Sequence, residues 1–362
     1  MREALACALV SVAISGSLGC SAVGPRSVRH GRARYNIAIQ QTNNEQLLLN
    51  LVRLRYRDTP YFLEVASVAT TFDLTASTAG AVELTEADSY TYGIETGISY
   101  SEQPTVTYTP LQGDEFVTQL MSPVDLNTLL LLYHSGWSIE RIFRVCLQSM
   151  NGLKNAPSAS GPTPSRVPVY EQFREASTLL RELQVRGAVE MGQVPGADSN
   201  ETFVELQIAE SEVDSTQVRR LCELLGLQAG QRSFRLTTEV GHGNSDRIAV
   251  VTRSLMASLF YVSQGVEAPP EDEMLGRVTV SRDAHGNRFD WKRVTGGLMQ
   301  IHSHKHHPAN TYVGVRYRGT WFCIHDDDLT SKSTFSLLMQ LFALQAGDIK
   351  ASGPVLTLPV GR

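Results

Sequence analysis

Four histidines in one short stretch are the residues of this sequence best suited to bind a metal ion. They are His302, His304, His306 and His307. Imidazole nitrogens are common zinc ligands, and on a strand the side chains of His302 and His304 would point to the same face, about 7 Å apart. That spacing can serve one metal ion, with His306 as a third candidate ligand. The local motif lacks a carboxylate and Pro308 indicates a loop, so we favour an exposed histidine loop without metal and keep the metal site as the alternative.

Nucleophilic catalysis has weaker support in the sequence. A serine hydrolase needs its nucleophile on a sharp turn such as GxSxG, and the chain contains no such motif. Three cysteines follow Cys20 in the chain, and all lie in apolar runs that predict buried small hydrophobes: Cys146, Cys222 and Cys323. At most one disulfide can form among them. We expect no cofactor and favour a non-enzymatic protein, with a metal-binding module or a metal-dependent enzyme as the alternative.

The elements around the histidines are predicted from the periodicity of the apolar residues. Short strands are expected over residues 278–280, 298–301, 312–317 and 320–324, with a tight turn at Arg318-Gly319. Two strongly apolar helices, residues 248–264 and 331–346, are expected to form the core of this domain. The C-terminal part of the chain is therefore predicted as a mixed α/β domain whose last sheet is mostly antiparallel.

A segment rich in proline and serine, residues 154–168, is predicted as a linker before this domain, because its composition cannot build a core. The domain before the linker is expected to be helical. Its first helix is predicted from a capping box at residues 42–45 to about Arg57. Two further apolar helices, over residues 126–133 and 139–147, are expected to pack as a helical hairpin.

Residues 60–110 alternate apolar and polar side chains over two long runs, which predicts a β-hairpin. In the second run, aromatic and branched side chains share one face: Tyr90, Tyr92, Ile94, Ile98 and Tyr100. This face either packs on the helices of its own domain or contacts lipid or other copies of the chain. Unpaired strand edges are costly in hydrocarbon, so contact with lipid would require several subunits.

The N-terminus has the layout of a secretory signal peptide, with an apolar run from Ala4 to Ile14 and small residues before Cys20. The run is shorter than the ~20 residues that a membrane-spanning helix needs. Ser17-Leu18-Gly19-Cys20 resembles the lipobox of bacterial lipoproteins, although its leucine lies one position later than that family prefers. The resemblance implies cleavage after residue 19, acylation of Cys20 and, because Ser21 is not aspartate, sorting to the outer membrane. An ordinary cleaved signal is the alternative.

Two further stretches resemble segments of bacterial envelope lipoproteins to which no activity has been assigned. They are the C-terminal stretch from Tyr317 to Gln345 and the run from Pro104 to Leu111. The resemblance implies only a location in the cell envelope. The protein would be attached to a membrane through its lipid and would face the periplasm. It transfers no catalytic residue and no ligand.

Composition and charge limit the partners. Hydrophobic residues make up 42% of the chain and charged residues 19%, which is enough for a substantial core. The formal net charge of −5 and the absence of a broad basic run argue against nucleic acid. We expect a structural or assembly component of the envelope that associates with itself or with other envelope proteins.

The sequence therefore predicts an α+β protein in five parts: a signal peptide over residues 1–19, a flexible lipidated tether over 20–41, a helical domain with a long hairpin over 42–153, a linker over 154–168 and an α+β domain over 169–362.

Overall fold

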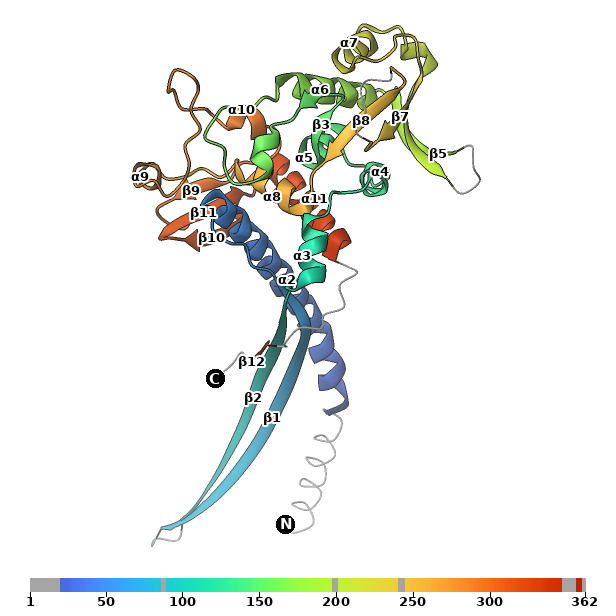
Figure 1. The fold of residues 1–362 in the computed structure, drawn as a ribbon. Coiled ribbons are helices and arrows are strands. Elements are labelled where there is room, and N and C mark those ends of the chain that lie inside the picture. Colours follow the sequence, from blue (N-terminus) through green and yellow to red (C-terminus); the bar gives the residue numbers. More distant parts are fainter. Residues whose placement is uncertain (1–19, 86–88, 197–200, 240–244, 347–355, 360–362) are drawn as a thin grey trace. The chain divides into compact units, whose positions relative to one another are not determined.

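The computed structural model describes residues 20–85, 89–196, 201–239, 245–346 and 356–359, with the backbone alone for 20–31, 69–104, 346 and 356–359. The chain divides into two compact units, Met1–Pro60 with Thr118–Gly347 and Tyr61–Val117 with Asp348–Arg362 (Figure 1). With 43% helix and 25% strand, the predicted α+β class is confirmed. The division between the units does not fall at residues 154–168, where the sequence predicted a linker.

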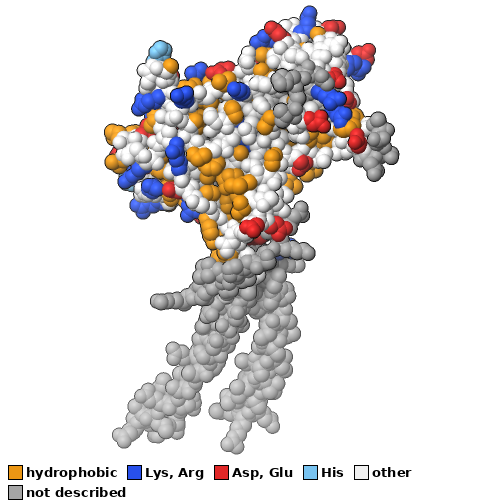
Figure 2. All heavy atoms as spheres, viewed as in Figure 1, with side chains coloured by type: hydrophobic (Ala, Val, Ile, Leu, Met, Phe, Trp, Pro, Cys, Tyr) orange, Lys and Arg blue, Asp and Glu red, His pale blue; other side chains and the backbone are white. Residues whose placement is uncertain are grey.

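The charged side chains of the first unit are mixed in sign. On the face shown in Figure 2, Lys and Arg side chains are interspersed with Asp and Glu side chains. A mixed surface of this kind, on a chain of net charge −5, differs from the continuous basic face that binds phosphate backbones. The expected absence of a nucleic-acid partner remains a prediction.

The second unit is built on a long β-hairpin of strands β1 (Leu63–Thr85) and β2 (Ser89–Pro110). They pair antiparallel from Leu63 opposite Pro110 to Thr85 opposite Ser89, with one irregularity after Val65. Strand β12 (Leu356–Pro359) pairs with the part of β2 nearest Pro110, so β1 lies at one edge of a three-stranded sheet. The predicted hairpin is confirmed.

Helix α2 (Cys20–Arg55) differs from the prediction at its start. The predicted tether over residues 20–41 is part of this helix. No capping box forms at Thr42, whose hydroxyl donates to the carbonyl oxygen of Ile39 at 3.0 Å inside the helix. Arg, Ala and Gln are frequent in this segment and favour helix, and a turn that already exists is extended at low cost. The predicted apolar face of the second half is buried: Leu47, Leu48, Leu51 and Leu54.

A mixed six-stranded sheet in the order β4-β3-β8-β7-β6-β5 lies in the first unit. Its strands are β3 (Leu147–Met150), β4 (Leu153–Lys154), β5 (Val189–Pro195), β6 (Thr202–Ile208), β7 (Ser233–Thr237) and β8 (Arg247–Thr252). Strands β7 and β8 run parallel, and every other neighbouring pair is antiparallel.

Strand β8 occupies the first half of a segment that the sequence predicted as one helix, residues 248–264. Burial alternates along it, with Ile248 and Val250 buried and Val251 exposed, which is the period of a strand. Its β-branched residues favour this conformation. Helix α8 (Leu255–Ser263) begins only after Ser254, whose hydroxyl oxygen accepts from the Ala257 N–H at 3.1 Å.

Helices pack around α8, which contacts α2, α5 (Ile139–Cys146) and α11 (Leu329–Ala346). The remaining helices of the first unit are α4 (Leu126–His134), α6 (Glu171–Val185), α7 (Thr216–Leu225), α9 (Pro270–Met274) and α10 (Lys292–Thr295), while α3 (Asp114–Met121) begins in the second unit. The predicted helices over 126–133, 139–147 and 331–346 are confirmed. Side chains of α11 form part of the core: Phe335, Leu337, Leu338 and Leu341.

The proline-rich segment 154–168 is held inside the first unit by a buried arginine. Asn155, Ala159 and Thr163 of this segment are buried. Arg253 is fully buried, and its guanidinium donates to four backbone oxygens: those of Arg144, Val145, Leu147 and Asn155. It also donates to the Ser160 hydroxyl oxygen at 2.9 Å. These bonds join the segment to the end of α5, which explains why a composition typical of linkers does not produce one here.

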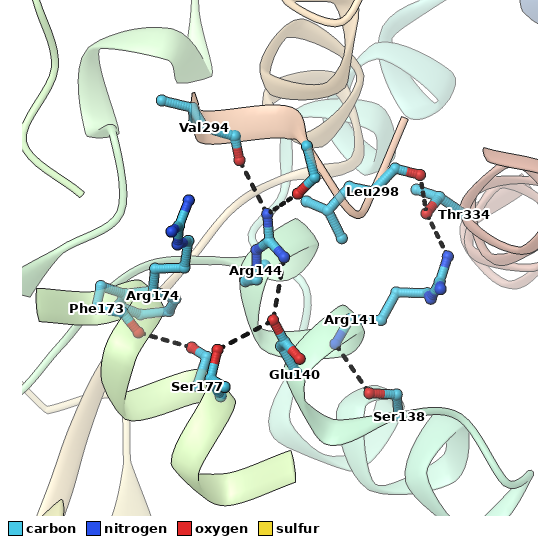
Figure 3. Close-up of polar contacts among 12 residues, drawn as sticks. Ser138, Glu140, Arg141, Arg144, Phe173, Arg174, Ser177, Val294, Leu298 and Thr334 are labelled. Atoms are coloured by element: carbon cyan, nitrogen blue, oxygen red, sulfur yellow. Dashed lines mark hydrogen bonds and ion pairs between the residues drawn. The ribbon is translucent and has the colours of Figure 1, made fainter. Parts of the chain in front are cut away.

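Two arginines of α5 join this helix to the C-terminal elements (Figure 3). Arg144 is buried and donates to the carbonyl oxygens of Val294 and Gly296, and it forms an ion pair with Glu140 at 3.1 Å. Arg141 donates to the hydroxyl oxygen of Thr334 on α11 at 2.6 Å. The α5 arginines therefore fix α10 and α11 relative to the central sheet.

The C-terminal sheet has the order β10-β11-β9. Its strands are β9 (His302–His304), β10 (Thr311–Tyr317) and β11 (Thr320–His325). The predicted turn at Arg318-Gly319 is confirmed, with φ of 48° and 87°. Strands predicted over 278–280 and 298–301 are absent among these described residues. Leu298 and Met299 instead donate to the Thr295 carbonyl oxygen, which continues the turn of α10.

Candidate metal centre

Strands β9 and β11 bring histidines and a cysteine to one face of the C-terminal sheet. Cys323 lies opposite His302 and Trp321 opposite His304 in the antiparallel register. Residues that face each other across such a pair point the same way, and the direction alternates along each strand. His302, His304, Cys323 and His325 therefore share one face.

Three of these side chains converge closely enough to bind one metal ion. A ligand atom from each of His304, Cys323 and His325 lies within 4.8 Å of the other two. In a tetrahedral zinc site with bonds of about 2.0–2.3 Å, ligand atoms are about 3.3–3.7 Å apart, so the side chains would close by about 1 Å. Imidazole nitrogen and thiolate sulfur are the ligand types that zinc prefers.

His304 has an unsatisfied nitrogen in this cluster. Its Nε2 atom is buried and has no hydrogen-bond partner. A buried polar atom without a partner destabilises a fold by about 1–3 kcal/mol. A metal ion bound to Nε2 would remove that cost.

The environment of Cys323 keeps its thiol protonated in the metal-free protein. Cys323 is fully buried, and burial, together with the nearby charge of Glu267, raises the pKa of the thiol to about 11. Metal ions bind the thiolate, so coordination would release this proton. The same burial makes the thiol a poor nucleophile.

Glu267 orients the ring of His302 next to this cluster. Its Nδ1 atom lies 3.2 Å from Oε2 of Glu267. Burial by itself raises the pKa of the Glu267 carboxyl, but hydrogen bonds from Lys292 and Gln300 hold it below its usual range, so it is ionised. An ionised carboxylate only accepts, so Nδ1 of His302 carries the proton and Nε2 presents its lone pair. Ligating histidines typically donate their other N–H to a carboxylate in this way.

The ring of His302 lies beside the three ligands. Its centroid is 5.0 Å from that of His325 and 6.4 Å from that of His304. Ser303, between the two β9 histidines, points to the opposite face of the sheet. His304, Cys323 and His325 therefore form a Cys-His₂ set, and the ring of His302 lies beside this set without belonging to it.

The histidines that follow β9 do not belong to this cluster. His306 and His307 are exposed in the loop after His304, where the strand ends, so the structure does not bring the predicted candidate His306 together with the other ligand atoms. The ring of His307 packs edge-on against Trp321, with centroids 4.5 Å apart.

The sequence prediction missed Cys323 and His325. Cys323 was interpreted as a buried hydrophobe, which its burial agrees with, and His325 follows it at the end of β11. The available signal was the repeated alternation, His-x-His in one strand and Cys-x-His in another. Its meaning depends on the non-sequential pairing of β9 with β11.

The other predicted site residues lie where the structure describes only the backbone. Cys20 is the first residue of α2, and its acylation remains a prediction. Tyr90, Tyr92, Ile94, Ile98 and Tyr100 lie on β2, opposite Leu84, Val82, Gly80, Ala76 and Leu74, and their side chains are outside the described set. Their contact with lipid or with another subunit also remains a prediction.

The described cysteines form no disulfide. Cys146, Cys222 and Cys323 are free, and all three are buried, as predicted. Burial raises the pKa of Cys146 to about 12, which makes it unreactive.

Among the described helices, none combines the length and the hydropathy that crossing a membrane requires.

The chain was compared with protein-family models, with curated proteins and with solved structures. None of them matches it.

Proposed function

We propose that this chain is a non-enzymatic, lipid-anchored protein of the bacterial cell envelope whose C-terminal sheet binds a transition-metal ion, with zinc as the best fit. The observation that carries the metal assignment is the convergence of donor atoms from His304, Cys323 and His325 within 4.8 Å. The envelope assignment rests on the lipobox-like sequence at Cys20 and implies the outer membrane, with the protein facing the periplasm.

The ligand set favours a structural role for the metal. Structural zinc sites use four protein ligands, whereas catalytic sites keep one position open for water or substrate. The ring of His302 lies 5.0 Å from that of His325, and the site would be closed if this side chain moved in as the fourth ligand. Strand β9 is only three residues long, and a metal bridging it to β11 would stabilise this short pairing.

The metal content of the purified protein tests this proposal. The mature protein, extracted in detergent and dialysed against zinc-free buffer, is expected to retain about one zinc per chain or to recover it on titration. His304→Ala and Cys323→Ser should each lower zinc affinity at least about tenfold, because each removes a ligand. His306→Ala is the matched control and should bind as wild type does. A wild-type protein without stoichiometric zinc would contradict the proposal, as would unchanged affinity in both ligand variants.

A second candidate function is self-association through the hairpin. The observation that favours it is the length of the β1–β2 ladder, from Leu63 to Thr85, combined with the position of β1 at the sheet edge. In the described part of that sheet, β1 has β2 as its one neighbouring strand, and long unpaired edges add strands from other chains.

Shortening the hairpin tests self-association. Asp73 lies opposite Ser101, so removal of residues 74–100 and insertion of an Asn-Gly turn preserves the register of the remaining pairs. We expect light scattering to give an oligomeric mass for the wild type and a monomeric mass for the shortened chain, with an unchanged zinc content. A monomeric wild type would exclude this function.

A further inference from the structure

The first unit contains a cavity of about 690 Å³ next to the metal centre. This volume is within the range of small-molecule sites, about 300–1,000 Å³. Its wall includes the end of α2, the loop after α8, α10 and the start of α11, with Arg55, Gln264, Glu273, Arg288, Trp291 and Lys292 among its residues. Glu267 lines the cavity and also bonds His302, whereas none of the three metal ligands is part of the wall.

Arg55 is a buried cation in this wall with an unused donor. It is 4% exposed, and its Nη1 atom donates to the hydroxyl oxygen of Thr163 at 3.2 Å and to the carbonyl oxygen of Thr279 at 3.1 Å. Its Nε atom is buried and has no partner. Burial lowers the pKa of Arg55 to about 10, so the group remains charged near neutral pH.

The other cations of the wall already have anionic partners. Arg288 pairs with Glu273 at 2.6 Å, and Lys292 pairs with Glu267 at 2.9 Å. Of the basic residues lining the cavity in the described structure, Arg55 is the one whose hydrogen bonds go to neutral oxygens alone. A buried charge in this position is costly unless an anion joins it.

Gln264 presents a complementary unused acceptor beside Arg55. It is 3% exposed, its Nε2 atom donates to the hydroxyl oxygen of Thr163 at 3.3 Å, and its Oε1 atom is buried without a partner. Because Arg55 also bonds Thr163, the two side chains lie next to each other. The wall therefore offers one free charged donor and one free acceptor at neighbouring positions.

We propose that this cavity binds a small oxyacid, a carboxylate or a phosphate ester, that also carries a hydroxyl or amino group. The acid oxygen would accept from Nε of Arg55 in a charge-assisted hydrogen bond, and the hydroxyl or amino group would donate to Oε1 of Gln264. Trp291 supplies apolar surface in the same wall for the carbon skeleton.

Calorimetric titration of the full mature protein with three matched probes tests this assignment. Glycerate carries a carboxylate with hydroxyls, glycerol 3-phosphate a phosphate with hydroxyls, and glycerol the hydroxyls alone. We expect saturable binding of at least one acid and none of glycerol, and the preferred acid identifies the anionic group. Arg55→Lys, which keeps the charge but removes Nε, should weaken that binding at least about tenfold.

Arg288→Gln is the control, because it removes a cation of the same wall that already has a carboxylate partner. It should change affinity less than about threefold. An unchanged urea-unfolding midpoint in each variant shows that the fold is intact, and this readout does not depend on whether the metal centre binds zinc. If Arg55→Lys does not fold, Gln264→Leu replaces it and should also weaken binding. The assignment is overturned if neither acid binds saturably, if glycerol binds equally well, or if the Arg55 and Arg288 variants behave alike.

Discussion

At the scale of single residues, a buried carboxylate makes part of the fold dependent on pH. Asp272 is 5% exposed, accepts from the Tyr56 hydroxyl at 2.5 Å and pairs with Arg277 at 2.7 Å. Burial alone raises the pKa of its carboxyl, but these two partners hold it below the ordinary value of 3.8. A lowered pKa stabilises the folded state above that value, and the contribution is lost as pH falls through the folded-state pKa.

Asp272→Asn should therefore lower the free energy of unfolding by about 1–3 kcal/mol at pH 7. The difference from wild type should shrink as pH falls below 3.8 and through the lower folded-state pKa, where the wild-type carboxylate also becomes protonated. Urea unfolding at pH 7 and at about pH 2.5 measures both values. Asp214→Asn, at an exposed position before α7, is the control and should change stability by less than about 0.5 kcal/mol. If Asp272→Asn lowered the free energy of unfolding equally at both pH values, the charge of Asp272 would not contribute to stability.

Only part of the candidate metal centre could be predicted from the sequence. The local alternation of His302 and His304 is visible in sequence because the period of a strand places both on one face. Cys323 and His325 join them only because β11 lies between β10 and β9 in the sheet. That pairing is set by tertiary packing, which a single sequence does not encode as a local pattern.

At the scale of elements, the sequence predicted helices and strands correctly where one hydrophobic periodicity continues along the whole element. The prediction failed where contacts with residues distant in sequence determine the conformation. Helix α11 was predicted over 331–346 and runs from Leu329 to Ala346, with most of its apolar residues from Phe335 onward. In contrast, the helix expected over 248–264 is a strand followed by a helix, because the change in period at Ser254 is masked by continuous apolar composition. The 154–168 segment has the composition of a linker, yet the buried guanidinium of Arg253 fixes it from a distance in sequence.

The buried side of α11 gives a prediction at this scale. Leu341 is 0% exposed, so Leu341→Ala should destabilise the protein by about 2–5 kcal/mol through lost burial and the remaining cavity. Leu344, on the same helix, is 44% exposed, and Leu344→Ala should cost less than about 1 kcal/mol. Guanidinium unfolding of both variants measures the difference. A loss below about 1 kcal/mol for Leu341→Ala would contradict the assignment of this helix to the core.

At the scale of the whole molecule, the proposal combines a lipid anchor with a chain whose described helices do not span a membrane. Two or more acyl chains anchor a protein stably, whereas one chain binds reversibly. Cys20→Ser should therefore move the protein from the outer-membrane fraction to the soluble periplasmic fraction on cell fractionation. Cys222→Ser, at a buried and free cysteine, should leave the distribution unchanged. Retention of the Cys20 variant on membranes washed in high salt would place the anchor elsewhere in the chain.

The metal centre is the central claim, and X-ray absorption spectroscopy of the zinc-loaded protein tests it most directly. The ligand set predicts one sulfur at about 2.3 Å and nitrogen ligands at about 2.0–2.1 Å. In Cys323→Ser the sulfur contribution should disappear, while in His306→Ala the spectrum should match that of the wild type. A wild-type spectrum with only light-atom ligands, or a sulfur contribution that persists in Cys323→Ser, would contradict the account.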